Sequence, residues 1–531
     1  MKSLEKGALN DMEYFQDTQR WLEQAEALKP ELHRKVVRPK RLVRAVRDES
    51  AFQGWRMEDA GKLHDVLDRP LDRNAVLVLD MGEYVVGHFS LKVDWIGKNM
   101  DAPLRLNLIF AERPCEVAEP LDSSNCTLSR GWFQDESVTL DILPQHVELP
   151  RRYAFRYVRL EVAGCSPAYQ PKLMDICCHA LSSAKAPKDM PDSDTFNAPL
   201  DAIDRISIKT LEACMQTVFE DGPKRDRRLW MGDVRLQALA NYATFRNYDL
   251  VKRCLYLFAG TANRDGWVSA AIFEAPEVSA SAEYCLDYAV LFGVTLADYV
   301  EASGDNDTGK DLLPVTLRQI ELAFGMLSEE FNFASISPWW TFIDWREGLH
   351  KDTAAVGILA YACGRVAGLA EKLGEGGIAE ELRAQKQKLI EAILEKLRDP
   401  ESGLFVSGPD RQLSWASQVW MILAEAVDQT EGKRLIELLE NREGALTPAG
   451  PYLWHYVAEA LVHCGMRKKA RALIEDYWGG MVDRGADTFW EVYDPENPKL
   501  SPYNNHLMNS YCHAWSCTPT WFIRSGMLGN L

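Results

Sequence analysis

Residues 354–398 read AAVGILAYACGRVAGLAEKLGEGGIAEELRAQKQKLIEAILEKLR and contain two helical patterns. In each pattern apolar residues recur at i, i+3, i+4 and i+7, which is the period of an amphipathic α-helix. About a dozen such segments follow residue 200, separated by short breaks that carry Gly, Pro or Asp. This number fits a closed (α/α)6 toroid of six hairpins as well as an irregular helical domain. The absence of a fixed-period repeat excludes the common solenoids.

The chain before residue 190 has a different pattern. Short alternating runs such as AVLVLDMG, LRLNLIFAE and YAFRYVRLEVAG lie between about residues 75 and 180. They predict an antiparallel β-sandwich. The stretch 182–199 is rich in Pro, Ser and Asp and reads as a linker. We therefore expect a mainly α, multidomain protein: a 1–70 extension that packs on the sandwich, a 71–190 β-sandwich domain and a 191–531 helical domain.

Composition narrows the class of protein. The 531 residues have 47% hydrophobic and 26% charged residues and a net charge of −18. Such an acidic balance argues against nucleic acid and anionic lipid as partners. No run approaches the roughly 20 apolar residues of a spanning helix. The first residues lack the pattern of a signal peptide, and the scattered twelve cysteines favour reduced thiols in the cytoplasm.

The breaks between helical segments are unusually aromatic and acidic. They are residues 221–233, 263–277, 337–348 and 485–506, and they carry a large share of the sixteen Trp. A sugar stacks its apolar face on aromatic rings, while carboxylates accept its hydroxyl groups. The loops therefore favour a carbohydrate cleft.

Three of these loops contain candidate acids. Residues 221–233, DGPKRDRRLWMGD, place three carboxylates near Trp230, and a carboxyl with a raised pKa there could protonate a leaving oxygen. Glu491, between aromatic residues, could act as a base towards water. Asp344 beside Trp345 could accept sugar hydroxyls. Each has a structural alternative: a salt-bridged loop with an Asp N-cap, an exposed Glu on a turn, and a capping Asp.

Other chemistries have less support. No H-E-x-x-H, P-loop, G-x-G-x-x-G or G-x-S-x-G motif is present. A lone His is more often structural than catalytic. His506 and His513 follow Glu491 in the chain, however, and this position favours a place in the same cleft.

The loops resemble those of the bacterial α-L-rhamnosidases of glycoside hydrolase family 78. Residues 221–233 resemble the family's Asp-Cys-Pro-x-Arg-Glu-Arg-x-Gly-Trp-Thr-Gly-Asp signature, FIDW its Gly-Asp-Trp loop and DTFWE its Thr-x-x-Trp-Glu loop. VLDMGEYVVGHFSLKV and RYVRLEV resemble its β-domain strands. The similarity covers roughly residues 75–525 in the same order. It implies β-sandwich domains, an (α/α)6 toroid and inversion at the anomeric carbon.

Carried over by position, the general acid falls on Asp226, where the family has Glu, and the general base falls on Glu491. The resemblance and the loop content together give a wider set of expected substrate-binding residues: Asp221, Arg225, Trp230, Asp233, Trp339, Trp340, Asp344, Trp345, Trp490, His506 and His513. Gly222 and Leu229 replace the signature's Cys and Gly.

The leading hypothesis is an inverting exo-glycosidase that removes a terminal α-L-rhamnosyl or related 6-deoxy sugar from an oligosaccharide or glycoside. One alternative is a toroid-fold lyase acting at a rhamnose–uronic acid linkage, with a base such as His506, His513 or Tyr511. Another is a sugar-binding protein without catalysis. We expect a small carbohydrate as the partner, no cofactor and no metal, and the sequence leaves a homodimer open.

Overall fold

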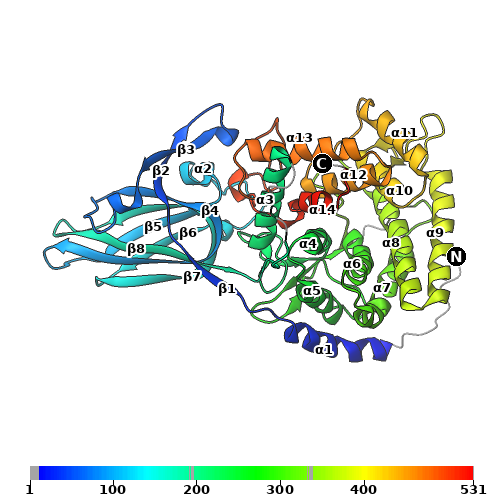
Figure 1. Ribbon diagram of the computed structural model, residues 1–531, viewed down its shortest axis with the longest axis horizontal. Coiled ribbons are helices and arrows are strands. Elements are labelled where there is room, and N and C mark those ends of the chain that lie inside the picture. The colour runs from blue at the N-terminus through cyan, green and yellow to red at the C-terminus, as the bar shows by residue number, and fades with distance from the viewer. Residues whose placement is uncertain (1–10, 191, 193–196, 332, 334–338, 530–531) are drawn as a thin grey trace.

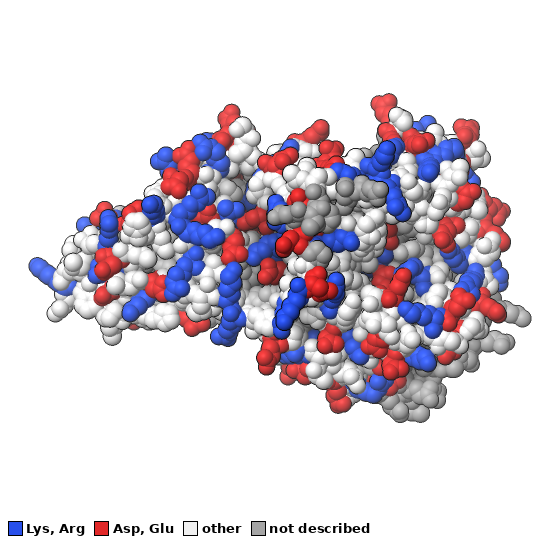
Figure 2. Space-filling view, in the orientation of Figure 1, with Lys and Arg blue, Asp and Glu red and all other residues white. Residues whose placement is uncertain are grey.

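The computed structural model describes residues 11–190, 192, 197–331, 333 and 339–529. Two parts lie side by side along the long axis of the molecule: a sheet occupies one end and helices occupy the other (Figure 1). Acidic and basic side chains are interspersed over the face shown in Figure 2. The negative net charge is therefore not gathered into one patch on this face.

The β-rich part is an eight-stranded antiparallel sheet. Its main order is β1-β8-β4-β7-β5-β6, and β2 pairs with both β4 and β3. The strands are β1 (His33–Val37), β2 (Arg41–Arg47), β3 (Trp55–Gly61), β4 (Val76–Gly97), β5 (Leu104–Ala111), β6 (Asp135–Leu140), β7 (Gln145–Gly164) and β8 (Tyr169–Ser182). Buried side chains such as Leu91, Phe110 and Phe155 form the core of this part.

The helical part begins after the sheet. In the described residues it contains twelve α-helices: α3 (Ala198–Cys214), α4 (Met231–Ala243), α5 (Tyr248–Gly260), α6 (Leu286–Ser303), α7 (Asn306–Met326), α8 (Asp352–Leu373), α9 (Gly376–Lys396), α10 (Trp415–Leu423), α11 (Gln429–Glu440), α12 (Pro451–His463), α13 (Arg467–Asp483) and α14 (Pro519–Arg524). Helices α4, α6, α8, α10 and α12 contact one another in that order, and the next helix in the chain packs against each of them.

The helices of the inner series are more deeply buried than the helices that pack against them. Nearly every residue of α4 and α6 is buried, whereas α9 and α11 bury only one face. A helix that is apolar on all sides belongs in the interior, and an amphipathic one belongs on the outside. The largely apolar α6 follows this rule, whereas α4 buries the polar side chains of Asp233, Arg235 and Gln237, and its sequence alone does not mark it as an inner helix.

Helix α8 corrects the expectation that no run is long and apolar enough to span a membrane. An 18-residue window of α8 has a mean hydropathy of 1.5, and 83% of it is buried inside the protein. Its position among α6, α7, α9 and α10 gives it the environment of a core helix.

The N-terminal residues also depart from expectation. Helix α1 (Asp11–Ala27) packs on α5, not on the sheet, and buries Trp21 and Ala25 in the core of the helical part. Its Arg20 binds Asp311 of α7 at 2.5 Å. The chain after α1 lies on the sheet: β1–β3 join it, and Leu67 and Pro70 bridge to Leu173 and Lys172 of β8. The buried side chains of Trp21 and Ala25 thus attach the start of the described chain to the helical part.

Short elements organise the connections. There are three small sheets. In the first, β10 (Ala271–Phe273) pairs with both β9 (Leu229–Trp230) and β11 (Ser279–Ala280). In the other two, β12 (Tyr284–Cys285) pairs with β13 (Trp339–Trp340) and β14 (Val406–Ser407) pairs with β15 (Gln412–Leu413). The short helices are α2 (Pro114–Ala118), η1 (Phe52–Gly54), η2 (Leu63–Asp65), η3 (Arg130–Trp132), η4 (His506–Met508) and η5 (Ala514–Ser516).

Candidate active site

The loop 221–233 is held in shape by the buried carboxylate of Asp221. This carboxylate accepts the backbone N–H groups of Asp226 at 3.2 Å and Arg228 at 3.1 Å. The Asp221 carbonyl accepts the N–H of Ala514 at 2.7 Å, which joins the loop to the C-terminal segment. Burial, reinforced by the charge of Asp226, raises the pKa of Asp221 to about 8.

Arg225 lies between the two predicted catalytic carboxylates. Its Nη2 binds Glu491 Oε2, and its Nη1 lies 3.7 Å from Asp226 Oδ1. Its Nε donates to the carbonyl of Met508 at 2.7 Å, and its guanidinium lies 4.1 Å from the centre of the Tyr503 ring. The structure thus brings together Asp226 and Glu491, which are far apart in the sequence.

The two carboxylates have different environments. Glu491 is 1% exposed and accepts hydrogen bonds from Arg225, the Tyr503 hydroxyl and the Ser510 N–H. The Asp226 side chain is 18% exposed, and its two ion pairs with Arg225 and Arg228 are long, at 3.7 and 3.9 Å. A buried, fully bonded carboxylate and an accessible, loosely held one are suited to different roles.

His513 lies between two further carboxyl groups. Its Nε2 is 4.0 Å from Asp221 Oδ2, and its Nδ1 is 3.7 Å from Asp233 Oδ1. Burial, with the charges of Asp221 and Glu491, raises the pKa of Asp233, whereas burial and Arg225 lower that of His513. Asp233 Oδ1 and His513 Nδ1 are buried without a hydrogen-bond partner in the described residues, so both can bind a polar ligand.

Asp344 is already engaged by the protein. Its carboxylate accepts the N–H groups of Ala449 at 2.7 Å and Gly450 at 3.1 Å, at the start of α12. Burial raises its pKa to about 6. The preceding residues Phe342 and Ile343 donate their N–H groups to Asp287 of α6, each at 3.0 Å. The interactions of Asp344 therefore fix the position of the loop.

The predicted tryptophans lie in three settings. Trp230 and Trp345 are half-buried, and the Nε1 of each is unpaired within the described part of the chain. Trp345 lies 5.9 Å from the Tyr503 ring, beside the partner of Glu491. Trp340 is half-buried beside Tyr288 and Phe342. The side chain of Trp339 is outside the described residues; its backbone pairs with Tyr284.

Trp490 and His506 lie against the β-rich part. Trp490 is 1% exposed, stacks on Phe52 at 5.1 Å and lies under the guanidinium of Arg113. His506 Nε2 is 3.3 Å from Glu119 Oε2. These two predicted sugar ligands therefore contact residues that precede the linker.

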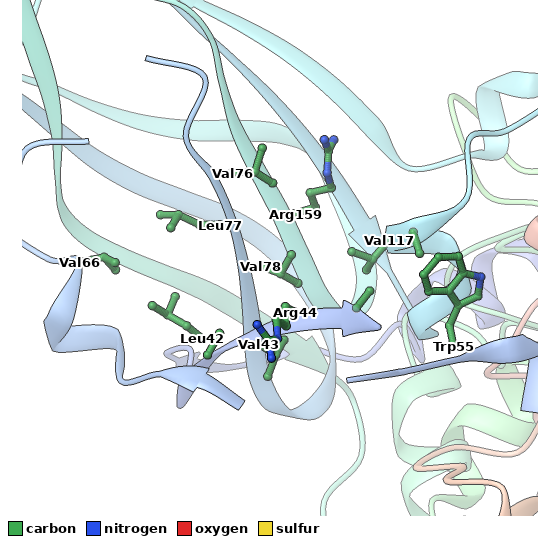
Figure 3. A pocket seen from close by; sticks show the side chains of 13 residues that line it. Leu42, Val43, Arg44, Trp55, Val66, Val76, Leu77, Val78, Val117 and Arg159 are labelled. Atoms are coloured by element: carbon green, nitrogen blue, oxygen red, sulfur yellow. The ribbon is translucent and has the colours of Figure 1, made fainter. Parts of the chain in front are cut away.

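One groove lies away from these residues. It has a volume of about 570 Å³ and lies on the β-rich part, where apolar side chains such as Leu42, Val78 and Val117 line it together with Arg44 and Arg159 (Figure 3). No predicted site residue lines it. The described residues also contain no group of three His, Cys, Asp or Glu that could hold a metal ion.

Comparison with known families identifies both parts of the chain. The model of the family 78 α-rhamnosidase N-terminal domain matches residues 39–180, and the model of the bacterial α-L-rhamnosidase six-hairpin glycosidase domain matches residues 193–526. The chain belongs to glycoside hydrolase family 78. It is therefore an enzyme of the glycoside hydrolase class, with a six-hairpin glycosidase domain behind a β-rich N-terminal domain.

Solved structures of rhamnosidases agree with this assignment. A rhamnosidase from Klebsiella oxytoca with rhamnose bound has a TM-score of 0.92 and 43% identity, over 96% of this chain and 98% of that chain. A rhamnosidase of Bacillus sp. GL1 has a TM-score of 0.72 and 21% identity, over 90% of this chain and 50% of that one. A Streptomyces avermitilis α-L-rhamnosidase complexed with L-rhamnose has a TM-score of 0.65 and 18% identity, over 93% of this chain and 44% of that one. The latter two share the fold. A comparison with curated proteins gave no significant match.

One cluster at the domain boundary of this family 78 chain was absent from the sequence-based prediction. Lys224, 1% exposed, binds Glu116 of α2 and lies 3.5 Å from Glu112. It also donates to the carbonyls of Leu507 and Asn509, at 3.0 and 2.9 Å. The N-terminal domain thus contacts the residue next to Arg225. The segment FAERPCEVAE offered only the spacing of Glu112 and Glu116, four residues apart, as a signal.

Proposed function

We propose that this chain is an inverting exo-α-L-rhamnosidase that releases a terminal rhamnosyl residue from a small oligosaccharide or glycoside. The observation that carries the proposal is the likeness, at 43% identity over 96% of this chain, to a rhamnosidase solved with rhamnose bound. We also propose that the inner and outer helices close into an (α/α)6 toroid and that the N-terminal domain is a β-sandwich.

In this proposal Asp226 donates a proton to the glycosidic oxygen. Its accessible carboxyl and long ion pairs leave it free to approach a substrate. Glu491, held by Arg225, Tyr503 and Ser510, takes a proton from the water that attacks the anomeric carbon. A fixed carboxylate orients this water well.

Inversion requires space for the water between the two carboxyl groups, typically about 6.5–9.5 Å. Asp226 and Glu491 face different Nη atoms of one guanidinium. This arrangement is compatible with that separation, and the inverting assignment rests on the resemblance of the loops to those of family 78.

We assign recognition of the sugar to Asp233 and His513, whose buried polar atoms lack protein partners in the described residues, and to the rings of Trp230 and Trp345. Polar atoms at this depth can be reached by the end of a sugar chain more readily than by its interior. Their burial therefore supports the exo mode of attack.

The test is hydrolysis of 4-nitrophenyl α-L-rhamnopyranoside followed by proton NMR. We expect β-L-rhamnose to form first and then to mutarotate. If α-L-rhamnose forms first, the mechanism is not inverting. If a product with a conjugated double bond forms from a rhamnose–uronic acid oligosaccharide in place of free rhamnose, the enzyme is a lyase and the proposal is wrong.

A further inference from the structure

The loop 221–233 contains four basic residues, and three of them are committed to the protein. Lys224 binds Glu116, and Arg225 binds Glu491. Arg227 Nε donates to the carbonyl of Pro223 at 2.8 Å. These three side chains therefore hold the loop in place.

Arg228 is different. Its backbone N–H is fixed by Asp221, but its guanidinium makes no hydrogen bond to any residue that the structure describes. The guanidinium lies 4.3 Å from the centre of the Phe273 ring, where a cation–π interaction holds it. The side chain is 28% exposed. It is an oriented cation with unused N–H donors.

The carboxylates on neighbouring segments do not serve as partners for Arg228. Glu274 binds Arg253 at 2.7 Å and accepts the Thr217 hydroxyl at 2.6 Å. Glu220 binds Arg152 with both oxygens at 2.7 Å. The carboxylate with which Arg228 forms an ion pair in the described residues is Asp226, whose Oδ2 is 3.9 Å from Nη1. That distance is too long for a hydrogen bond.

This position relates Arg228 to the substrate, and this step rests on the proposed function. A general acid lies about 2.6–3.2 Å from the oxygen that it protonates. Arg228 Nη1, 3.9 Å from Asp226, then lies within about 7 Å of the glycosidic oxygen. That oxygen joins the rhamnosyl residue to the leaving group, so substituents next to the linkage lie within reach of the Arg228 side chain.

We propose that Arg228, supported by Phe273, binds a carboxylate on the leaving group, and that the preferred substrates are α-L-rhamnosides of a uronic acid. In a hexuronic acid linked through its 4-hydroxyl, the carboxylate is attached to the ring carbon next to the linkage. An Arg–carboxylate pair of about 2.8 Å can then form within the available distance. Arginine suits this role because its planar fork can bind both oxygens of a carboxylate.

The test compares two substrates that differ in one charge: 4-O-α-L-rhamnosyl-D-galacturonic acid and its methyl ester. We expect the wild-type enzyme to favour the acid over the ester by about tenfold or more in kcat/KM, since hydrogen bonds to charged groups contribute about 1.5–3 kcal/mol. Arg228→Met removes this preference. Arg228→Lys retains a smaller preference, because it keeps the charge without the fork.

Arg151→Met is the control for loss of a positive charge. Arg151 lies on β7 of the N-terminal domain and pairs with Glu136, so this variant keeps the wild-type preference. The ratio is measured within each variant, and partial misfolding does not change it. Equal kcat/KM for acid and ester in the wild type, or an unchanged acid-to-ester ratio in Arg228→Met, overturns this inference but leaves the proposed function standing. Failure of the wild type to release rhamnose from both substrates overturns the proposed function.

Discussion

At the scale of single residues, the function of Asp226 depends on its proton. Asp226→Asn keeps the backbone N–H that Asp221 accepts but removes the acidic proton. We expect kcat/KM for a rhamnosyl disaccharide to fall by about 10²–10⁴. The fall for the 4-nitrophenyl glycoside is smaller, because nitrophenolate leaves without much protonation. The two substrates are compared at one pH, with thermal unfolding as the test of folding. Equal losses on both would argue against the assignment of Asp226 as the acid.

The sequence supplies candidate site residues but not the contacts that these residues make. Asp226 and Glu491 could be named from their loops, but the guanidinium that joins them could not, because Arg225 is one of four basic residues in the loop 221–233. Asp344 had two interpretations, and its bonds to Ala449 and Gly450 come from a segment about 100 residues away. Burial of Lys224 depends on Glu112 and Glu116 of the other domain, and no local pattern contains that information.

At the scale of elements, the start of α4 is packed against α6. A Cβ at Gly232 would lie 2.1 Å from the Tyr288 ring, next to Asp233. Gly232→Ala should therefore destabilise the protein by about 1–3 kcal/mol and lower activity, because Tyr288 must move. Gly368→Ala is the matched control in α8, where a Cβ meets nothing within 4 Å. It should be neutral or stabilising by up to about 1 kcal/mol. Urea unfolding of both variants checks this; similar losses would contradict it.

The contact of Asp344 with the two residues before α12 gives a second prediction at this scale. Asp344→Ala leaves the N–H groups of Ala449 and Gly450 without their acceptor, and we expect stability to fall by about 1–3 kcal/mol together with a lower kcat/KM, since the loop with Trp345 loses its anchor. Asp428→Ala removes the N-cap of α11, where Asp428 accepts the Glu431 N–H at 2.8 Å. That variant should lose stability without losing activity. Equal activity of the two variants would show that the loop does not need this anchor.

Periodicity located the helices better than the strands. The helical period gave α8 and α9, but the runs AVLVLDMG and YAFRYVRLEVAG cover only parts of the long strands β4 and β7. Strands β1 and β2 were not predicted, because HRKVV and RLVRAVR are rich in Arg and Lys and only some of their residues are buried. Such strands are specified by their partners β8 and β4, not by their own apolar pattern.

At the scale of the whole molecule, the buried cluster between the domains makes stability depend on pH. Burial raises the pKa of Glu112 from 4.5 to about 7, against the charge of Lys224. Between these values the folded state holds a proton that the unfolded state has released, so stability falls as the pH rises through this window. The glutamine side chain of the Glu112→Gln variant carries no charge at any pH. We therefore expect the stability of this variant to fall less than that of the wild type when the pH is raised from 5 to 8.

Chemical unfolding at both pH values measures this difference. Glu443→Gln, at an exposed position, is the control and should keep the wild-type dependence. If the stability of Glu112→Gln depends on pH as strongly as that of the wild type, the dependence comes from other buried acids, among them Asp221, whose pKa is raised to about 8.

The contact of Lys224 with Glu112 and Glu116 also constrains how such enzymes can be recombined. A chimera that takes its N-terminal domain from one relative and its catalytic domain from another would join two halves of a charge cluster that were not selected together. If one domain lacks the charge that the other requires, the remaining buried charge has no partner, and stability falls by about 3–5 kcal/mol. These three positions should therefore be inherited, exchanged or redesigned as a set.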